Sequence, residues 1–427
     1  MNIYGACNKG GLRMTLTIAV VGAGARGQIY ARAAAADGRA RIVAVADPDP
    51  ARRAALATEH DVPEQSRFTG WADLAAVPKL ADAVVIATQD RLHVEPAVAF
   101  AELGYAILLE KPLAPTEAEA RRIVEAVERS GVVFAICHVL RYTAYTKAFK
   151  ELLGSGRLGS ISSVQHLEPV GWWHMAHSFV RGAWRNAAES GPMLLTKSCH
   201  DIDWLLHLVG DEPVAVSSFG SLTHFRPENR PEGAGTRCVS CPVEPTCPYS
   251  ATRLYLGCLG DPAREFWPLG AVTSDASTAG VMRALETGPY GRCVYDCDND
   301  VVDQQVVTLE FARGATASLT MTAFTPLEHR KTRVFGTHGF AEGDGRHIRI
   351  VDFATGAEET LDTGTNAGAS LADGHGGGDA GLVRAFIDAV AAGDQAPLGA
   401  DPAEALAGHL VVWAAERARE TRTVQAL

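Results

Sequence analysis

The stretch VVGAGARG, Val20 to Gly27, decides the fold of this chain. It overlaps the apolar run 18–21 and precedes an alanine-rich segment, so its glycines fit G-x-G-x-x-G at a turn from strand to helix. In that geometry Gly22 makes the tight turn, Gly24 lets the backbone approach a pyrophosphate, and Gly27 lets helix pack on strand. The helix N-terminus then faces the phosphate charge. The candidate contacts of this loop are Gly22, Gly24, Ala25, Arg26 and Gly27.

A second apolar run, 42–46, ends in Asp47, 20 residues after Gly27. A carboxylate at this position accepts hydrogen bonds from a ribose hydroxyl and repels a 2′-phosphate, which favours NAD over NADP. The alternative is an ordinary glycine turn followed by an aspartate that caps the turn at 48–50. The order of strand, glycines, helix, strand and acid favours the NAD site.

Apolar runs and helix-period segments alternate through the first third of the chain. The expected strands cover 18–21, 42–46, 83–87, 106–109 and 132–136, and the expected helices 26–36, 50–60, 94–103 and 116–130. This alternation predicts an α/β protein whose residues 15–139 form a doubly wound, parallel Rossmann sheet. Function in such sheets lies at the carboxyl ends of the strands.

Two of these strand ends carry polar residues. They are Thr88, Gln89 and His93 after the third expected strand, and Glu110 and Lys111 after the fourth. A lysine directly after a buried strand lies where the nicotinamide end of the cofactor is expected. The bond to Pro112 is one at which a cis peptide costs little. These residues join the glycine loop and Asp47 as candidate cofactor contacts.

At these residues the sequence resembles the glucose-fructose oxidoreductase / inositol dehydrogenase / MocA family. The resemblance covers nearly the whole chain after Met14. It rests on the glycine loop, the Glu-Lys-Pro run that contains Lys111, and the later segment 193–209 with His200, in that order. It implies a Rossmann domain followed by an α/β domain with an open, mainly antiparallel sheet. It also implies that Lys111 borders the nicotinamide and hydrogen-bonds the reacting hydroxyl.

The segment MLLTKSCHDIDWLLHLV, Met193 to Val209, is predicted to be one helix. Its apolar stripe comprises Leu195, Cys199, Ile202, Leu206 and Val209, and its polar stripe Lys197, His200, Asp201 and Trp204. If the apolar stripe faces the core, the polar stripe faces solvent or a cleft. In the family an aspartate usually stands four residues before the histidine and pairs with it, whereas this chain has Thr196 there. We expect Lys197 or Asp201 to take over; the alternative is a solvated charged face.

Candidate substrate contacts come from two further segments. The linking helix expected over 140–153 would place Arg141 and Tyr142 near the cleft. The stretch GWWHMAHSFVRGAWR, 171–185, combines indoles that can stack on sugar faces with arginines that can hold carboxylate, sulfonate or vicinal hydroxyls. Its candidates are Trp173, His174, His177, Arg181 and Arg185. The alternative is an interface loop or a satisfied core corner. The later GHGGGD stretch adds His375, which could reach the cleft.

The rest of the chain is expected to form a substrate-binding and oligomerisation domain, 140–400, with a C-terminal helix and tail over 401–427. Alternating strands over 211–223 and 306–355 suit an open antiparallel sheet. Such a sheet has a free face that often pairs with another subunit. We therefore expect a homo-oligomer, a dimer or tetramer.

A cysteine-rich insertion is expected over 224–300. RCVSCPVEPTCPYS supplies Cys238, Cys241 and Cys247, and C-x2-C with a third cysteine close behind suits a tetrahedral zinc site. We favour Cys293 as the fourth ligand because it follows a tight turn. The remaining candidates for that position are Cys258 and Cys297. An iron–sulfur cluster and free thiols are the alternatives to a structural zinc ion.

Composition narrows the class of protein. The 427 residues are enough for two or three domains, and 39 Lys plus Arg against 50 Asp plus Glu give a net charge of −11. Non-specific attraction to nucleic acid or anionic membrane is therefore not expected. No run approaches the length of a membrane span, and residues 1–13 lack the apolar core of a secretion signal. We expect a cytoplasmic protein, with these residues a flexible tail or Met14 the real start.

The leading hypothesis is hydride transfer between NAD and a hydroxyl-bearing carbon of a sugar, polyol or acidic sugar. A base must take the hydroxyl proton, and Lys111 is the candidate because burial and a cationic ring favour the neutral amine. His200 would orient or relay the proton, and Lys197 would neutralise an anionic substrate or share the relay. The rival is an NAD-dependent redox glycosidase for an acidic or sulfonated glycoside. The third hypothesis is a non-catalytic NAD-sensing or assembly protein.

Overall fold

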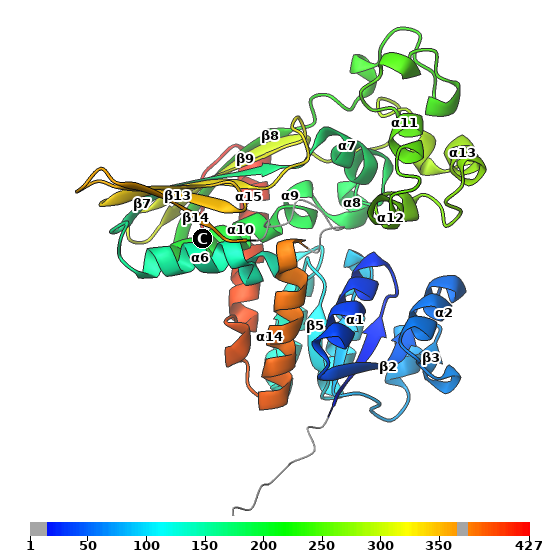
Figure 1. Ribbon diagram of the computed structural model, residues 1–427, viewed down its shortest axis with the longest axis horizontal. Helices are drawn as coiled ribbons and strands as arrows, with labels where there is room; N and C mark the ends of the chain where they lie inside the picture. Colours follow the sequence, from blue (N-terminus) through cyan, green and yellow to red (C-terminus); the bar gives the residue numbers. More distant parts are fainter. Residues whose placement is uncertain (1–14, 365–374) are drawn as a thin grey trace, which may run out of the picture.

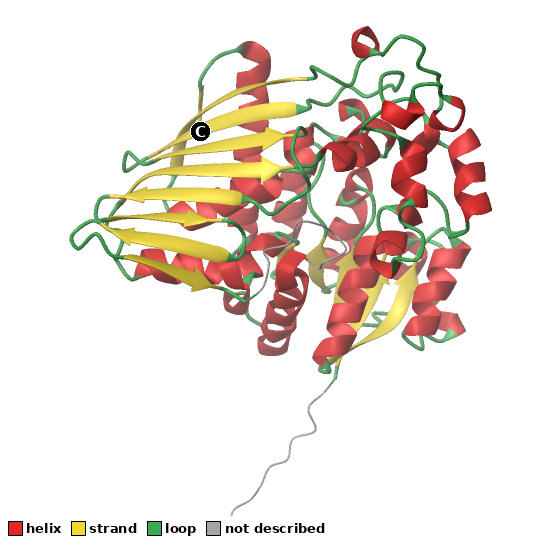
Figure 2. Cartoon of the chain, turned by 45° about the horizontal axis from the view of Figure 1, so that its top comes forward, coloured by secondary structure: helices red, strands yellow, loops and turns green. Residues whose placement is uncertain are grey.

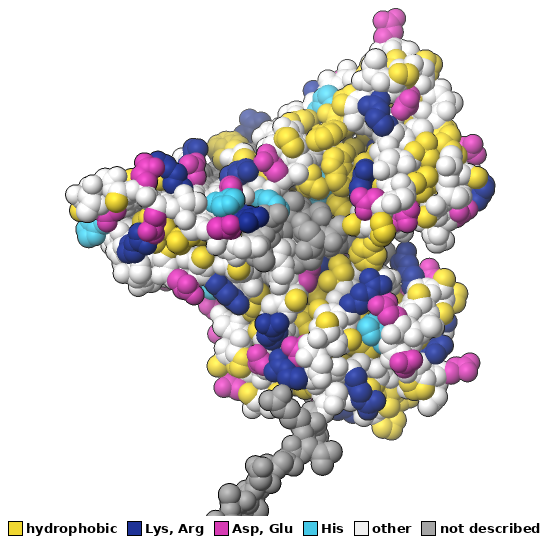
Figure 3. Space-filling view, in the orientation of Figure 1, with side chains coloured by type: hydrophobic (Ala, Val, Ile, Leu, Met, Phe, Trp, Pro, Cys, Tyr) yellow, Lys and Arg dark blue, Asp and Glu magenta, His cyan; other side chains and the backbone are white. Residues whose placement is uncertain are grey.

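A computed structural model describes residues 15–364 and 375–427 of the chain. The proposed tail before Met14 lies outside these residues. Within them, no helix is long and apolar enough to cross a membrane. On the face seen in Figure 3, basic and acidic side chains are interspersed.

The first domain contains a six-stranded parallel sheet in the order β3-β2-β1-β4-β5-β6. Its strands are β1 Leu16–Val21, β2 Ala40–Ala46, β3 Arg67–Phe68, β4 Ala83–Ile86, β5 Ala106–Leu109 and β6 Phe134–Ile136. Its helices are α1 Ala25–Asp37, α2 Pro50–Glu59, α3 Trp71–Ala75, α4 Val94–Glu102 and α5 Glu117–Ser130. The predicted doubly wound sheet is confirmed. The two-residue β3 and the five-residue α3 were not predicted, because such short elements carry no periodic pattern.

The second sheet has nine strands in the order β14-β13-β12-β11-β7-β10-β9-β8-β15 (Figure 2). They are β7 Ile161–Pro169, β8 Pro213–Ser221, β9 Gln304–Phe311, β10 Thr316–Thr322, β11 Lys331–Gly336, β12 Gly339–Gly343, β13 His347–Asp352, β14 Glu358–Asp362 and β15 Gln425–Ala426. Only the pair β7–β10 is parallel, so the sheet is mainly antiparallel, as the sequence indicated. Side chains along β9 alternate between buried and exposed, which leaves one face of the sheet uncovered.

Helices that follow the first sheet in the chain join the two sheets. They are α6 Ala144–Gly154, α7 Trp172–His174, α8 Ala187–Ser190, α9 Met193–Thr196, α10 Cys199–Val209, α14 Gly378–Ala392 and α15 Pro402–Thr421. The apolar side of α14 packs into the core beside α1, and α15 packs between α5, α10 and β8. Figure 1 shows both helices standing beside the Rossmann sheet. The C-terminal part of the chain thus fixes the second domain to the first.

The insertion, 224–300, forms a separate lobe of short helices at the upper right of Figure 1. Its α-helices are α11 Ala251–Leu256, α12 Pro262–Phe266 and α13 Thr278–Thr287. Its apolar side chains form a cluster of their own around Tyr255 and Leu285. The lobe reaches back to the first domain, because the Arg32 guanidinium of α1 lies 5.7 Å from the ring centre of Phe266 in α12.

Candidate active site

The glycine loop has the geometry that its motif predicted. Gly22 has a φ of +95°, and a Cβ there would lie 2.4 Å from the Ala87 carbonyl oxygen of the neighbouring strand end. A Cβ on Gly27 would lie 1.9 Å from the Gly22 oxygen, so α1 can pack here only without a side chain. A Cβ on Gly24 would meet nothing within 4 Å. The loop is tight on its protein side and open at Gly24, where a pyrophosphate is expected.

Asp47 is buried at the end of β2 and faces this loop. Its Oδ2 accepts a hydrogen bond from the Ala23 N–H at 2.6 Å, and its Oδ1 accepts one from the Asp49 N–H at 2.8 Å. The carboxylate therefore caps the turn, as the alternative interpretation held, and also braces the glycine loop. Each oxygen keeps a lone pair for a ribose hydroxyl.

The end of β4 is braced by His93. Its ring is fully buried between the carbonyl oxygens of Thr88, 3.2 Å from Nε2, and Pro112, 2.8 Å from Nδ1. His93 thus holds together the loops after β4 and β5, and the Lys111–Pro112 bond in the second of these is cis. Gln89 is exposed and Thr88 half-buried, so these two side chains remain the cofactor candidates of this loop.

Arg26 and Glu110 form a buried ion pair. The Glu110 carboxylate accepts from Arg26, from the Tyr30 hydroxyl at 2.8 Å and from the Lys111 N–H at 2.6 Å. Burial alone would raise the pKa of Glu110, but the positive charges of Arg26 and Lys111 outweigh it and lower that pKa. Arg26 also donates to Asp379 of α14 at 2.6 Å. The sequence suggested that Arg26 contacts the cofactor, but its side chain binds two buried carboxylates instead. These contacts hold β5, α1 and α14 together.

Lys111 reaches across to the second domain. Its Nζ donates to the carbonyl oxygen of Thr196, the last residue of α9, at 2.5 Å. The prediction of a single helix over 193–209 was wrong. Helix α9 ends at Thr196, Lys197 and Ser198 interrupt the helical segment, and α10 begins at Cys199. The interruption places a main-chain acceptor opposite the lysine and carries His200 on the first turn of α10.

His200 lies in an imidazole-rich surrounding. Its ring centre is 5.7 Å from that of His138 and 6.3 Å from that of His375, and its buried Nδ1 has no hydrogen-bond partner among the described residues. Burial first, and then the positive charge of Lys111, hold the pKa of His200 well below its usual value. The ring is therefore neutral near pH 7, and its nitrogen can accept a hydrogen bond. His375 is in turn 3.0 Å from the Asp379 carboxylate.

The polar stripe of α10 is buried. Asp201 is fully buried and accepts from Arg330, and its Oδ1 is 3.1 Å from Nε2 of His166 on β7. Burial raises the pKa of Asp201, but Arg330 and His166 overcome this and lower it below the ordinary range. A carboxylate so tightly bound stays ionised, so Asp201 is a structural residue and not the expected proton relay. Trp204 stacks on His166, with ring centres 4.7 Å apart.

Lys197 forms an ion pair with Glu168, a carboxylate that the sequence pattern did not indicate. Its Nζ lies 2.9 Å from Oε1 of Glu168 on β7, and Oε2 of the same glutamate lies 2.9 Å from Nε of Arg330. Glu168 is buried, and its side chain points toward α10 because alternate residues of β7 face that helix. Two cations and two carboxylates therefore balance in this cluster of Lys197, Glu168, Arg330 and Asp201.

Arg141 and Tyr142 are also placed differently from expectation. Arg141 donates twice to Asp203, at 2.6 and 2.8 Å, and the Tyr142 hydroxyl donates to the Leu398 carbonyl oxygen at 2.9 Å. Both line a separate small cavity of about 20 Å³ next to β6. They fix α10 and the C-terminal segment to the end of β6, because a buried arginine needs a carboxylate partner.

Aromatic rings beside Lys197 form a candidate substrate wall. The rings of Trp173 and His174 contact Trp267 of the insertion, with centres 5.3 and 4.9 Å apart. All three are half-buried. Burial, followed by the charge of Lys197, holds the pKa of His174 well below its usual value. Trp267 had no sequence signal beyond its position before a proline in the insertion.

The remaining candidates of the segment 171–185 bind to the insertion. His177 lies 2.7 Å from the Tyr255 hydroxyl, and burial lowers its pKa to about 3. Arg181 is buried within π-helix η4 (Met175–Arg181) and donates to main-chain oxygens of the insertion. Arg185 donates to Asp298 at 3.0 Å. These three corrections share a reason: the insertion supplies partners that a linear pattern cannot show.

Two groups could suggest a metal. Cys238, Cys241, Cys247 and Cys293 line one cavity of the insertion. The atoms of His138, Cys199 and His409 lie within 4.8 Å of one another. However, Nδ1 of His409 donates to the Ala405 oxygen at 2.8 Å and Nε2 accepts from the Leu113 N–H at 3.1 Å. Both ring nitrogens are occupied, so this second group is not a metal site.

Comparison with known proteins places this geometry in a family context. The model of an oxidoreductase family with an NAD-binding Rossmann fold matches residues 16–138. The model of the C-terminal α/β domain of that family, the glucose-fructose oxidoreductase / inositol dehydrogenase / MocA family, matches residues 150–425. Together the two matches span nearly all of the described chain.

Individual relatives agree with this match. The chain is 26% identical to the oxidoreductase YteT of Bacillus subtilis over 319 residues, 72% of this chain and 71% of that protein. It is 29% identical to the 2,7-anhydro-N-acetylneuraminate hydratase of Escherichia coli over 209 residues, about half of each chain (49% and 54%). A levoglucosan dehydrogenase structure with NADH and levoglucosan shares the fold, with a TM-score of 0.70, 20% identity, and coverage of 96% of this chain and 99% of that one.

Proposed function

The chain belongs to the glucose-fructose oxidoreductase / inositol dehydrogenase / MocA family of NAD-binding oxidoreductases, and from that premise we propose that it transfers a hydride between NAD and a hydroxyl-bearing carbon of a neutral sugar or polyol. The observation that carries the proposal is the position of Lys111. Its amine stands at the carboxyl end of β5, bonded to the carbonyl oxygen of Thr196, four residues before His200.

The residues present fit the dinucleotide. There is free space beside Gly24, whereas backbone atoms crowd Gly22 and Gly27. The N-terminus of α1 comes directly after Gly24 in the chain. We assign the pyrophosphate to this loop and the adenosine ribose to Asp47. When bound, the nicotinamide ring supplies the hydride acceptor or donor. The acid–base work is left to the side chains of the protein.

Lys111 and His200 divide that work. The Thr196 carbonyl holds Nζ of Lys111 in place, and the amine hydrogen-bonds the reacting hydroxyl and takes its proton. His200 is neutral because burial lowers its pKa, so its ring can orient the same hydroxyl by a hydrogen bond. The carboxylate that usually pairs with this histidine in the family is absent, and Asp201 does not replace it.

The charge balance favours a neutral substrate over an acidic one. Lys197 is neutralised by Glu168, and Arg185 is neutralised by Asp298. Arg181 is buried against the insertion. The cations that the sequence suggested for a carboxylate or sulfonate are therefore engaged. The partners that remain for a sugar are uncharged: hydroxyl groups of the protein and the rings of Trp173, His174 and Trp267.

The test is NADH absorbance during incubation of the enzyme with NAD and a panel of neutral sugars, polyols, uronic acids and glycosides, with products identified by NMR. We expect NADH in proportion to a keto-sugar or lactone from a neutral compound. Preference for a uronic acid would overturn the assignment of a neutral substrate. NAD binding without turnover of any compound would overturn the enzymatic function and leave the NAD-sensing hypothesis.

A second candidate function is supported by one observation, the pair formed by His375 and Asp379 beside His200. Hydride transfer alone does not need this extra acid–base pair, whereas elimination or hydration at a transiently oxidised sugar does. Similarity to a protein named 2,7-anhydro-N-acetylneuraminate hydratase points the same way. A redox glycosidase would release an aglycone without accumulating NADH, and His375→Ala would stop that release but not oxidation of a simple polyol.

We also infer a cytoplasmic homo-oligomer, a dimer or tetramer. The uncovered face of the second sheet carries Phe219 and Val306 opposite each other, 65% and 37% exposed. No disulfide links the cysteines of the described residues, which suits a reducing compartment. Light scattering should show a dimer or tetramer that Phe219→Glu dissociates. A monomeric wild-type protein would contradict the inference.

A further inference from the structure

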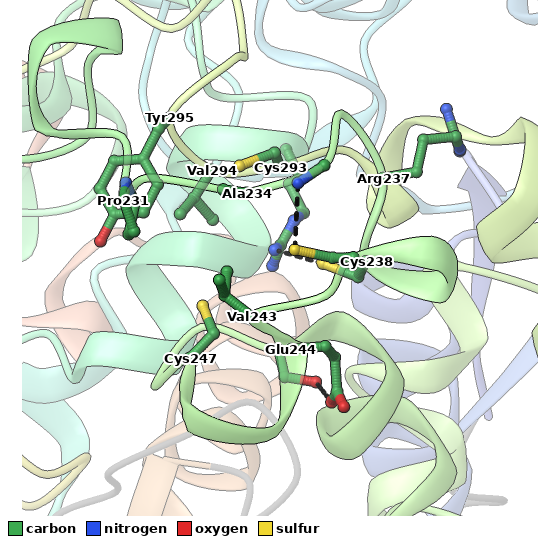
Figure 4. A pocket seen from close by; sticks show the side chains of 14 residues that line it. Pro231, Ala234, Arg237, Cys238, Val243, Glu244, Cys247, Cys293, Val294 and Tyr295 are labelled. Carbon is green, nitrogen blue, oxygen red and sulfur yellow. Dashed lines mark hydrogen bonds between the residues drawn. The ribbon is translucent and has the colours of Figure 1, made fainter.

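Four cysteines of the insertion surround a single cavity. Cys238, Cys241, Cys247 and Cys293 line a space of about 20 Å³, room for about one water-sized species. Figure 4 labels Cys238, Cys247 and Cys293 around it. Three of them come from the turns at 238–247, and Cys293 comes from the far end of the insertion. The isolated bridge between Arg237 and Arg292 brings these ends together. The fold thus assembles one four-sulfur site from two distant segments.

The sulfurs of this site accept hydrogen bonds. The Gly235 N–H donates to Sγ of Cys241 at 3.2 Å, and Nη2 of Arg181 donates to Sγ of Cys238 at 3.4 Å. N–H groups aimed at sulfur are the usual surroundings of metal-bound thiolates. Cys258 and Cys297, the other two cysteines of the insertion, donate to carbonyl oxygens four residues earlier, each at 3.2 Å. Cys238 also donates to a carbonyl oxygen, that of Arg292, but at the longer distance of 3.9 Å.

Arg181 provides an independent indication of negative charge. It is 1% exposed, its hydrogen-bond acceptors are main-chain oxygens and a sulfur, and it forms no ion pair with a carboxylate of the described residues. Its Nη1 is buried without a hydrogen-bond partner, and the residue lines the cavity. A buried guanidinium without an anion is costly. Four thiolates around a doubly charged metal carry a net charge of −2, which supplies the missing anion.

We propose that Cys238, Cys241, Cys247 and Cys293 hold a thiolate-bound metal centre that anchors the insertion to the segment 171–185. Four thiolates select zinc or an iron–sulfur cluster among biological metals. No three of the four sulfurs lie within 4.8 Å of one another. Zinc, with Zn–S bonds of about 2.3 Å, would draw the sulfurs to about 3.8 Å, whereas a cluster accommodates a wider spacing.

The centre has a structural consequence for the substrate wall. Arg181 ends η4, the helix that follows Trp173 and His174, and it bonds both Cys238 and the carbonyl oxygens of Tyr249 and Arg292. Loss of the metal would loosen the insertion and with it the contact of Trp173 with Trp267. The glycine loop lies in the other domain and should keep its affinity for NAD.

The first test is metal analysis of the full-length protein purified without added metal, under air and under anaerobic conditions. We expect either about one zinc per chain, or iron with acid-labile sulfide and visible charge-transfer absorption. Cys247→Ser and Cys293→Ser should lose most of the metal, whereas Cys258→Ser and Cys297→Ser should keep it. Neither metal above trace level, or equal loading in all four variants, would overturn the proposal.

A second measurement avoids misfolded variants and needs no substrate. Titration of the native wild-type protein with an organomercurial should release the metal to a coloured chelator in step with modification of about four thiols. Reaction of these thiols without release of metal would overturn the proposal. Because both experiments read metal and not turnover, their failure is distinguishable from failure of the proposed reaction. With a substrate in hand, Cys293→Ser should raise its KM and leave the Kd for NAD unchanged.

Discussion

The two sides of the candidate site are built in different ways. The cofactor side consists of strand ends and tight turns, in which each residue is positioned by neighbours in its own motif, as Gly27 is by Gly22. The substrate side is assembled from segments far apart in the chain, such as Glu168 of β7 with Lys197 and Arg330. Local geometry can be recognised in a sequence. Long-range partners can reverse the role that the sequence suggests for a charged residue.

The most severe test of this contrast is Lys111→Met, because the Lys111 amine reaches from the cofactor side to the Thr196 carbonyl of the substrate side. We expect kcat to fall by about 10²- to 10⁴-fold through loss of the proton acceptor. The Kd for NAD, measured by calorimetry, should change little. Lys147→Met, on the exposed face of α6, is the matched control. Undiminished turnover of Lys111→Met would remove the residue from the mechanism.

Glu168→Gln probes the substrate side alone. Breaking a buried ion pair from one partner leaves an unpaired charge and costs about 3–5 kcal/mol of unfolding free energy. The freed Lys197 should also raise kcat/KM for a uronic acid relative to the neutral sugar. Denaturant unfolding and paired kinetics measure both effects. The double variant Glu168→Gln/Lys197→Met should recover most of the stability, and a failure to do so would mean that Glu168 acts mainly through Arg330.

The cofactor side can be tested by two alanine substitutions in one loop. Gly24→Ala should leave the melting temperature of the apoprotein unchanged, because its Cβ meets nothing, but weaken NAD binding about tenfold by blocking the pyrophosphate. Gly27→Ala should destabilise the apoprotein itself by about 1–3 kcal/mol through the clash with the Gly22 oxygen. Thermal melts with and without NAD separate the two. The opposite pattern would refute the assigned roles.

Asp47→Asn should change which dinucleotide binds. The amide oxygen can still accept from the Ala23 N–H, but the charge that repels a 2′-phosphate is lost. We expect the preference for NAD over NADP to fall about tenfold, a change of ~1.4 kcal/mol. Competitive binding of the two dinucleotides measures it. Asp49→Asn, at the exposed N-terminus of α2, should keep the wild-type preference, and a change there would point to a diffuse charge effect.

A further expected effect is a pH dependence of stability. Burial lowers the pKa of His409 and of His177 to about 3, whereas an unfolded histidine titrates near about 6.5. Below that pH the unfolded chain binds protons that the native protein does not. The unfolding free energy should therefore fall as pH drops from about 6.5 to about 4, by up to ~1.4 kcal/mol per pH unit for each such histidine.

Urea unfolding across this pH range measures how steeply the unfolding free energy changes with pH. Two substitutions test whether these histidines cause that change. His409→Gln keeps an acceptor for the Leu113 N–H and should flatten the slope, and His177→Phe should do the same from the insertion side. Carboxylates such as Asp203, whose pKa is lowered by His138 and Arg141 against the effect of burial, lose their contribution only below about 4. A slope unchanged in both variants would exclude these histidines as its source.

Much of the fold could be predicted because its elements have strong local patterns. The buried apolar runs of β1, β2, β4 and β5 and the alternation in β9, β10 and β13 mark strands in any context. β11 and β12 were not distinguished within the predicted range 306–355, and β7, β14 and β15 lie outside the predicted ranges. The interruption of the helix at Lys197 left no trace in its periodicity. There the tertiary contact of Lys111 with the Thr196 carbonyl outweighs local helix preference.

By itself, the sequence determined the Rossmann domain, the NAD loop, Lys111 at a strand end and the grouping of cysteines in an insertion. Each depends on residues close together in the chain and on backbone geometry that only certain residue types allow. Only the tertiary structure decided the partners of the charged residues. It paired Lys197 with Glu168, Asp201 with Arg330 and Arg141 with Asp203. A buried charge is stable only beside a counter-charge, and which segment brings that counter-charge is settled by packing across the whole molecule.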